Sequence, residues 1–338
     1  MGFKDEITEK ELSELAKPCL RLFMSVDVVG STAFKQERNR SDPQGWLEFF
    51  SSFYTEFPEL LNTALLFILR QKKIKAAPPE ALLWKALGDE LIFVVEISHR
   101  SEAEVHLLAF REAVRKTVTS FIHKEGFLSV NFKATAWLAG FPVGNAAVPL
   151  DDQKGGIPYD FIGPLIDIGF RLANLATPRR FVVSVELAYL ILNCKDSVID
   201  FYFEGKTQLK GVIQNRSYPF IWMDNYKGAE GADRHPEHEL TEKEDGLTGK
   251  APSNSPTLKD FCLAYIKEIG APLMIPFIAT DPADGLEKSK EYDIEREVIE
   301  NRLRKVFIVR EDIEITSTES SQDAVDTEKL DIDKLLPE

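Results

Sequence analysis

A turn of glycine and aspartate between two apolar runs is the feature of this chain that most constrains its fold. Gly88 and Asp89 separate the run 81–83 from the β-branched and aromatic run 91–95. Two such runs with a glycine and an aspartate in the turn between them are typical of a β-hairpin. The hairpin would display the Asp89 carboxylate at its tip, where it could bind a cation, although aspartate is also common in turns for conformational reasons alone.

A second acidic turn lies upstream of the hairpin. The apolar run Leu20–Val26 predicts a strand that delivers Asp27 and then opens into a turn that contains Gly30, Ser31 and Thr32. A carboxylate beside free backbone N–H groups suits a metal-chelated phosphate. Two carboxylates on neighbouring strand ends, with a phosphate-sized loop between them, indicate a two-metal nucleotide site.

Composition limits the kind of protein that this chain can be. Its 338 residues suggest about two domains, and 44% hydrophobic residues are ordinary for a globular protein. The formal net charge of −14 argues against nucleic acid or an anionic membrane surface as the main partner. Cys19, Cys194 and Cys262 lack metal-ligand spacing and are expected to be reduced thiols, which fits the cytoplasm. Residues 1–17 do not resemble a signal peptide, and no apolar run is long enough to span a bilayer.

The apolar periodicity predicts alternating helices and strands over the first two thirds of the chain. Helices are expected over 5–17, 46–70, 102–124, 163–176 and 185–192, and strands over 20–27, 81–83, 91–95, 130–139, 181–184, 199–203 and 217–222. This order is β-α-β-β-α-β with additions, which predicts an α+β, ferredoxin-like fold.

The composition changes abruptly after residue 225. Residues 226–257 are polar and aperiodic, which predicts a linker. A small α+β module is expected over 258–314, with helices at 258–269 and 294–305 and strands at 272–279 and 306–314, before an acidic tail at 315–338. The predicted units are an N-terminal helix at 1–17, a catalytic domain at 18–225, the linker, a candidate sensory module and the tail.

Four motifs, in order, resemble the class III nucleotide cyclase catalytic domain over about residues 18–222. They are Asp27-Val-Val-Gly30-Ser31-Thr32, Lys85 four positions before Asp89, the helix Asp160-Phe-Ile-Gly163-Pro-Leu-Ile-Asp167-Ile-Gly-Phe-Arg171, and Leu209-Lys210-Gly211-Val212. Any one of these motifs alone is a weak signal, whereas four at the family's spacing are a strong one.

The resemblance implies a role for each of these residues. Asp27 and Asp89, with Val28 beside the first, would hold two divalent cations, Mn²⁺ or Mg²⁺. The residues expected to bind phosphate are Gly30, Ser31, Thr32 and Lys210, and those expected to read the base are Lys85 and Asp160.

The helix with Asp167 and Arg171 carries the remaining catalytic residues. Arg171 would stabilise charge on the α-phosphate. The family has asparagine where this chain has Asp167, and a carboxylate cannot donate the amide's hydrogen bond to the ribose. Asp167 is therefore expected to hold Arg171, four residues away on the same helix face. An ordinary surface Asp–Arg pair would leave the same pattern.

The resemblance also implies partners. In the family, the metal half and the complementary half face each other across a two-fold interface, which implies a homodimer with two composite sites for a nucleoside triphosphate. The chain looks most similar to the pyrimidine cyclases of Pycsar antiphage systems, because Pro164 and Asp167 depart from the usual helix and a small module follows a linker. Such an enzyme would convert UTP, or else CTP, into a cyclic nucleotide that activates a separate cell-killing effector.

Two other functions stay open from the residues alone. A lysine donor beside an aspartate acceptor suits adenine and cytosine directly, and uracil with the roles exchanged, so a soluble adenylyl cyclase is the first alternative. A catalytically degenerate nucleotide-binding sensor is the second. Four aromatic residues of the helix at 46–70 would either belong to the core or narrow a base pocket: Phe49, Phe50, Phe53 and Tyr54.

Overall fold

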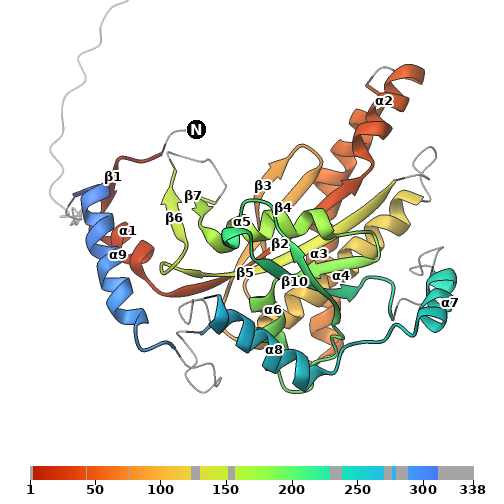
Figure 1. Ribbon diagram of the computed structural model, residues 1–338. Helices are drawn as coiled ribbons and strands as arrows, with labels where there is room; N and C mark the ends of the chain where they lie inside the picture. Colours follow the sequence, from red (N-terminus) through yellow and green to blue (C-terminus); the bar gives the residue numbers. More distant parts are fainter. Residues whose placement is uncertain are drawn as a thin grey trace, which may run out of the picture.

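A computed structural model describes most of the chain (Figure 1). The described residues are 3–42, 44–74, 76–122, 130–150, 157–228, 238–269, 276–278 and 288–310. The strands are β1 (Glu6–Thr8), β2 (Cys19–Val29), β3 (Leu82–Leu87), β4 (Glu90–Ile97), β5 (Asn131–Phe141), β6 (Ala146–Pro149), β7 (Tyr159–Ile162), β8 (Arg180–Val183), β9 (Tyr202–Gln208), β10 (Ser217–Asp224) and β11 (Ile308–Arg310). The helices are α1 (Glu9–Ala16), α2 (Ser31–Ser41), α3 (Trp46–Gln71), α4 (Arg100–Ile122), α5 (Pro164–Leu172), α6 (Val185–Leu192), α7 (His238–Thr248), α8 (Ser255–Glu268) and α9 (Tyr292–Val306).

A seven-stranded mixed sheet with the order β3-β4-β2-β5-β8-β10-β9 forms the centre of the fold. Its first four strands are antiparallel, and together with α3 and α4 they make the β-α-β-β-α-β unit. The predicted α+β, ferredoxin-like fold is therefore confirmed. The register sets Asp27 of β2 opposite both Glu90 of β4 and Lys133 of β5.

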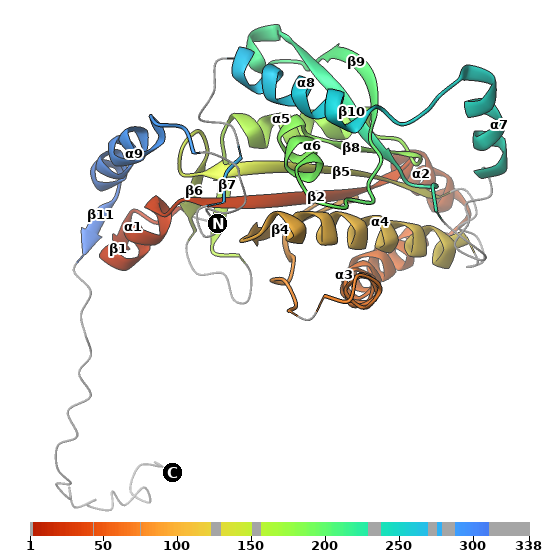
Figure 2. The same cartoon turned by 90° about the horizontal axis from the view of Figure 1, so that it is seen from below.

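Strand β2 is buried on both faces, which explains its nearly continuous apolar sequence. On one face, α3 and α4 lie side by side and cover the sheet (Figure 2). There Phe93, whose partner in β2 is Met24, packs between Phe57 of α3 and Phe110 of α4. The opposite face carries Phe23 and, further along the strand, Asp27, because alternate residues of a strand point to opposite faces.

Helix α5 packs against β5 on the face that carries Phe23. Phe23 stacks on Trp137 of β5 at 5.4 Å between ring centroids. Gly169 of α5 is required here, because a Cβ at this position would lie 2.2 Å from the Trp137 ring. This close approach sets the distance between the sheet and helix α5, which carries Asp167 and Arg171.

The C-terminal elements pack on elements from the first part of the chain. Helix α8 lies on α6, and its Cys262 and Ile266 belong to the main hydrophobic core. Helix α9 packs on α1, and β11 pairs with β1 in parallel (Figure 2). Arg304 of α9 forms a 2.7 Å ion pair with Glu9 of α1. Helix α8 thus lies on α6 and helix α9 on α1, and the predicted domain boundaries stay predictions.

Several elements differ from the expectations. The helix expected over 5–17 begins only at Glu9, because residues 6–8 form strand β1 and pair with β11. Helix α2 and the β6–β7 hairpin were not predicted, and α7 lies inside the segment predicted to be a linker. Strand β9 is shifted toward the C-terminus relative to 199–203. The strand expected at 272–279 lies largely outside the described residues, and its described part, 276–278, is not in a strand. The tail at 315–338 also lies outside them. No helix of the described ranges is long and apolar enough to cross a membrane.

Candidate functional site

The two predicted metal-binding carboxylates lie on one cleft. Asp27 follows the continuous run of buried residues 22–26 in β2, and Asp89 lies in the turn between β3 and β4. The backbone N–H of Val28 donates a 3.3 Å hydrogen bond to the carbonyl oxygen of Asp89, which ties the hairpin tip to β2. The cleft has a volume of about 410 Å³ and is also lined by the predicted phosphate-binding residues Gly30, Ser31 and Thr32.

A left-handed turn at Gly30 forms one wall of this cleft. Gly30 has φ +74°, a conformation that favours glycine, and α2 begins at the next residue. No side chain caps the start of α2, so its first N–H groups are available to an anion. The Ser31 hydroxyl donates a hydrogen bond to Oδ2 of Asp89, which links this turn to the hairpin.

Lys133 is a residue of the cleft that the sequence did not reveal. Its Nζ lies 2.9 Å from Oδ2 of Asp27, and it lines the same cleft. Burial raises the pKa of Asp27; the Lys133 ammonium opposes this shift and the Asp89 carboxylate adds to it. Burial likewise raises the pKa of Glu90, whose carboxylate accepts a hydrogen bond from the Ser25 hydroxyl. The sequence signal for Lys133 was a single charge inside an otherwise apolar strand.

The donor set of the cleft suits a hard divalent cation. Asp27 and Asp89 offer carboxylate oxygens, and Mg²⁺ is usually held by one or two carboxylates together with substrate phosphates. Among the residues that the structure describes, no three His, Cys, Asp or Glu side chains gather to hold a metal ion. The residues therefore fit cations that are shared with a bound triphosphate.

The predicted base-reading residues form an ion pair. Nζ of Lys85 on β3 lies 2.7 Å from Oδ1 of Asp160 on β7. The same Nζ lies 4.4 Å from the centroid of the Trp84 ring, and Trp84 contacts Phe161 at 5.2 Å. The aromatic residues beside this pair are thus Trp84 and Phe161.

The aromatic cluster of α3 does not form a base pocket. Phe49, Phe50 and Phe53 are buried in the core beneath α3. Tyr54, the most exposed member of the cluster, donates a hydrogen bond from its hydroxyl to the carbonyl oxygen of Gly88. The possibility that these side chains narrow a base pocket is therefore wrong, because three of them fill the interior and the fourth contacts the hairpin turn.

Of the remaining predicted site residues, Asp167 lines a second cleft. Asp167 of α5 lines a cavity of about 350 Å³ together with Gly211, which follows Lys210. Arg171 and Lys210 are exposed. No ion pair joins Asp167 to Arg171 in the part of the chain that the structure describes, so the expectation that Asp167 holds Arg171 is not met. Among the described residues, none lines both clefts.

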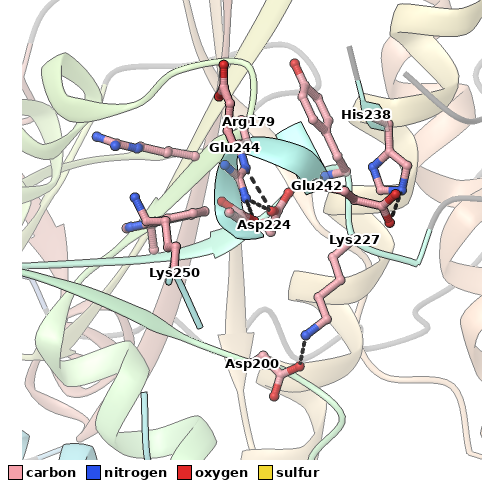
Figure 3. A network of polar contacts seen from close by, with 12 residues as sticks. Arg179, Asp200, Asp224, Lys227, His238, Glu242, Glu244 and Lys250 are labelled. Atoms are coloured by element: carbon pink, nitrogen blue, oxygen red, sulfur yellow. Dashed lines mark hydrogen bonds and ion pairs between the residues drawn. The ribbon is translucent and has the colours of Figure 1, made fainter. Parts of the chain in front are cut away.

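A polar network anchors α7 beside the first cleft (Figure 3). Arg179, which follows the cleft-lining Pro178, donates a 2.9 Å hydrogen bond to Asp224 and also pairs with Asp245 of α7. Nearby, Nζ of Lys227 lies 2.7 Å from Asp200. This network explains how a polar segment is folded onto the ends of β8 and β10.

Comparisons with known proteins give structural matches only. No family model and no curated protein matches the chain. The adenylyl cyclase CyaB from P. aeruginosa is 12% identical over 64% of this chain and 98% of its own, with a TM-score of 0.42. The guanylate cyclase domain of RhGC from Catenaria anguillulae, in complex with GTP, is 13% identical over 61% and 97%, with a TM-score of 0.41. The guanylyl cyclase Cya2 is 11% identical over 62% and 92%, with a TM-score of 0.40. At these values the likeness assigns no activity to this chain, and the residues of the two clefts carry the functional argument.

Proposed function

We propose that this chain is a class III nucleotide cyclase, which converts a nucleoside triphosphate into a 3′,5′-cyclic nucleotide and pyrophosphate. The observation that carries the proposal is the pairing of Asp27 and Asp89 on one cleft beside the open turn Gly30-Ser31-Thr32. Turn conformation alone does not require two aspartates to lie together at an uncapped helix start, where an anion can bind. The second support is the order and spacing of the four sequence motifs.

The cleft supplies groups for a triphosphate. Two divalent cations, Mn²⁺ or Mg²⁺, held by Asp27, Asp89 and the Val28 backbone would lower the pKa of the ribose 3′-hydroxyl and neutralise the leaving pyrophosphate. The N–H groups after Gly30 bind phosphate oxygens. A cation on Asp27 would replace its ion pair with Lys133, and the freed ammonium would bind the phosphates, because Lys133 lines the same cleft.

The complementary half positions the reacting groups. Lys85 and Asp160 hold the base, so that the ribose 3′-oxygen faces the α-phosphorus. The bond from this oxygen to phosphorus forms as the bond to the β-phosphate oxygen breaks, and the hydroxyl proton passes to water. Arg171 stabilises the charge on the α-phosphate, and Lys210 binds the outer phosphates.

The two halves belong to different subunits in this proposal. Within the described part of one chain, no residue lines both clefts. Apolar side chains beside the Lys85–Asp160 pair are exposed, with Leu83 at 42%, Leu87 at 46% and Ile162 at 54%. An isologous homodimer would cover such side chains and bring each metal half to a complementary half.

For the base, we propose a pyrimidine, with UTP preferred to CTP. This rests on the resemblance to the Pycsar cyclases, and it extends to a product that activates a separate antiphage effector. ATP is the second candidate, because the Lys85 donor and Asp160 acceptor lie side by side and match the amino-bearing edge of adenine directly.

Competition among the four nucleotides tests both the reaction and the base. The purified protein is incubated with Mn²⁺ and equal concentrations of ATP, GTP, CTP and UTP, and the products are identified by mass spectrometry. We expect cyclic UMP to dominate. If cyclic AMP dominates instead, the protein is an adenylyl cyclase and the pyrimidine proposal is wrong. If no cyclic nucleotide forms, the proposed function is overturned.

A further inference from the structure

The turn that carries Asp89 lies at the edge of the sheet. Strand β3 is the edge strand and pairs only with β4 in the central sheet. Gly88 at the tip is exposed, whereas Asp89 is half-buried. Exposed hairpin tips are among the more mobile parts of a fold. A carboxylate at such a position needs further contacts if it is to stay in place as a ligand.

Three groups from other elements hold this turn. The Val28 N–H donates to the Asp89 carbonyl at 3.3 Å, and the Ser31 hydroxyl donates to the Asp89 side chain. The third group is the Tyr54 hydroxyl of α3, which donates to the carbonyl oxygen of Gly88. The Ser31 contact occupies Oδ2, one of the two Asp89 carboxylate oxygens that a cation would use, so binding of a cation to that oxygen would compete with it. The hydrogen bonds from Val28 and Tyr54 to backbone carbonyls of the turn would persist.

The position of the Tyr54 hydroxyl is set by the core. Its ring packs against Phe50 at 6.2 Å and Phe53 at 5.9 Å, and both phenylalanines are buried. Tyr54 does not line the cleft, and its contact with the turn comes from outside the site.

We propose that Tyr54 is a positioning residue for Asp89, which fixes the hairpin turn so that the carboxylate is preorganised to bind a divalent cation. This inference rests on the proposed function. Because Tyr54 acts only through the Gly88 carbonyl, its hydroxyl affects the affinity for the cation rather than the chemical step at saturating cation.

The test compares Tyr54→Phe with a control from the same helix. Tyr54→Phe keeps the packed ring and removes only the hydroxyl. Thr63→Val also removes a hydroxyl that donates to a backbone carbonyl, but its acceptor is Glu59 within α3. Binding of Mn²⁺ alone is measured by electron paramagnetic resonance of the free ion, with Asp89→Asn as the variant that lacks the ligand. Cyclisation is then measured as a function of Mn²⁺ concentration.

We expect Tyr54→Phe to raise the dissociation constant for Mn²⁺ about fivefold, as the loss of one net hydrogen bond predicts. The Mn²⁺ concentration for half-maximal cyclisation should rise by the same factor, while kcat at saturating Mn²⁺ stays near the wild-type value. Thr63→Val should match the wild type in both measurements.

Two results would overturn the positioning role in distinguishable ways. If Tyr54→Phe binds Mn²⁺ as tightly as the wild type while Asp89→Asn does not, Asp89 is a ligand but Tyr54 does not position it. If Asp89→Asn and the wild type bind Mn²⁺ equally and neither forms a cyclic nucleotide, the proposed function fails, and the role of Tyr54 fails with it.

Discussion

Asp27 and Asp89 are the two residues on which the proposed chemistry depends. Replacing either carboxylate by the isosteric amide removes a charged ligand from a half-buried cleft. We expect Asp27→Asn or Asp89→Asn to lower cyclic-nucleotide formation on the order of a hundredfold or more. Circular dichroism should show an unchanged fold, and Asp260→Asn on the exposed side of α8 is the matched control. More than a tenth of the wild-type activity in either variant would remove the two-metal assignment.

Local sequence signals revealed the acidic turns but not their neighbours. Asp27, Gly30 and Asp89 could be placed because strand ends and turns leave short-range patterns. Lys133 could not, because its position beside Asp27 depends on the register between β2 and β5, which are more than a hundred residues apart in the chain. Tyr54 was placed on the correct helix, yet its contact with Gly88 depends on how α3 packs beneath the hairpin.

Glu186 offers a test of stability at the residue scale. It lies in the first turn of α6 with 1% of its surface exposed, and in the described part of the chain its Oε1 has no hydrogen-bond partner. Burial raises the pKa of Glu186 above the ordinary value of 4.5. The folded state therefore binds more protons than the unfolded state above this pH, so stability falls as pH rises toward the folded-state pKa.

Glu186→Gln should remove this dependence on pH. The neutral amide loses no proton, so we expect a free energy of unfolding higher by about 1 kcal/mol or more at neutral pH, and a smaller decline between pH 5 and pH 8. Urea unfolding at several pH values measures both effects. If the free energy of unfolding of the variant changes with pH as steeply as that of the wild type, and is lower at every pH, Glu186 is not a buried titrating group.

At the scale of elements, periodic segments were predictable and polar ones were not. Helices α3, α4 and α6 follow from apolar spacing, and they form close to the expected residues. Helix α7 was predicted as a linker because its sequence is polar. Tertiary contacts stabilise this helix, above all the ion pair of Asp245 with Arg179. Arg179 also pairs with Asp224 (Figure 3).

We therefore expect Asp245→Asn to loosen α7. The ion pair is partly exposed, with 17% and 22% of the two side chains accessible, so the cost in overall stability should be about 1 kcal/mol or less. Hydrogen exchange of the amides at 238–248 should rise several-fold while that of β2 and β5 stays constant. The control is Lys243→Gln, because the pair Lys243–Glu239 is far more exposed. Equal exchange in both variants would show that Arg179 does not anchor the helix.

At the scale of the whole molecule, the order of elements was sufficient to predict the ferredoxin-like part of the central sheet. The β-α-β-β-α-β order limits the arrangement of β2 to β5, because each helix carries the chain across the sheet and leaves β2 between β4 and β5. The packing of α9 on α1 joins the two ends of the described chain, and no local signal in either helix reports its partner. A contact with a second subunit likewise leaves no local signal in the sequence of any one segment.

The central claim is that the two halves of the site cooperate across two chains to cyclise a nucleotide, and complementation tests it most directly. Asp27→Asn lacks the metal half, and Arg171→Ala lacks the complementary half, so each variant alone should be inactive. Random exchange makes half of the dimers mixed, each with one intact site, and the mixture should regain about a quarter of the wild-type rate of cyclic-nucleotide formation. An inactive mixture, with subunit exchange verified by native mass spectrometry, would contradict the composite site.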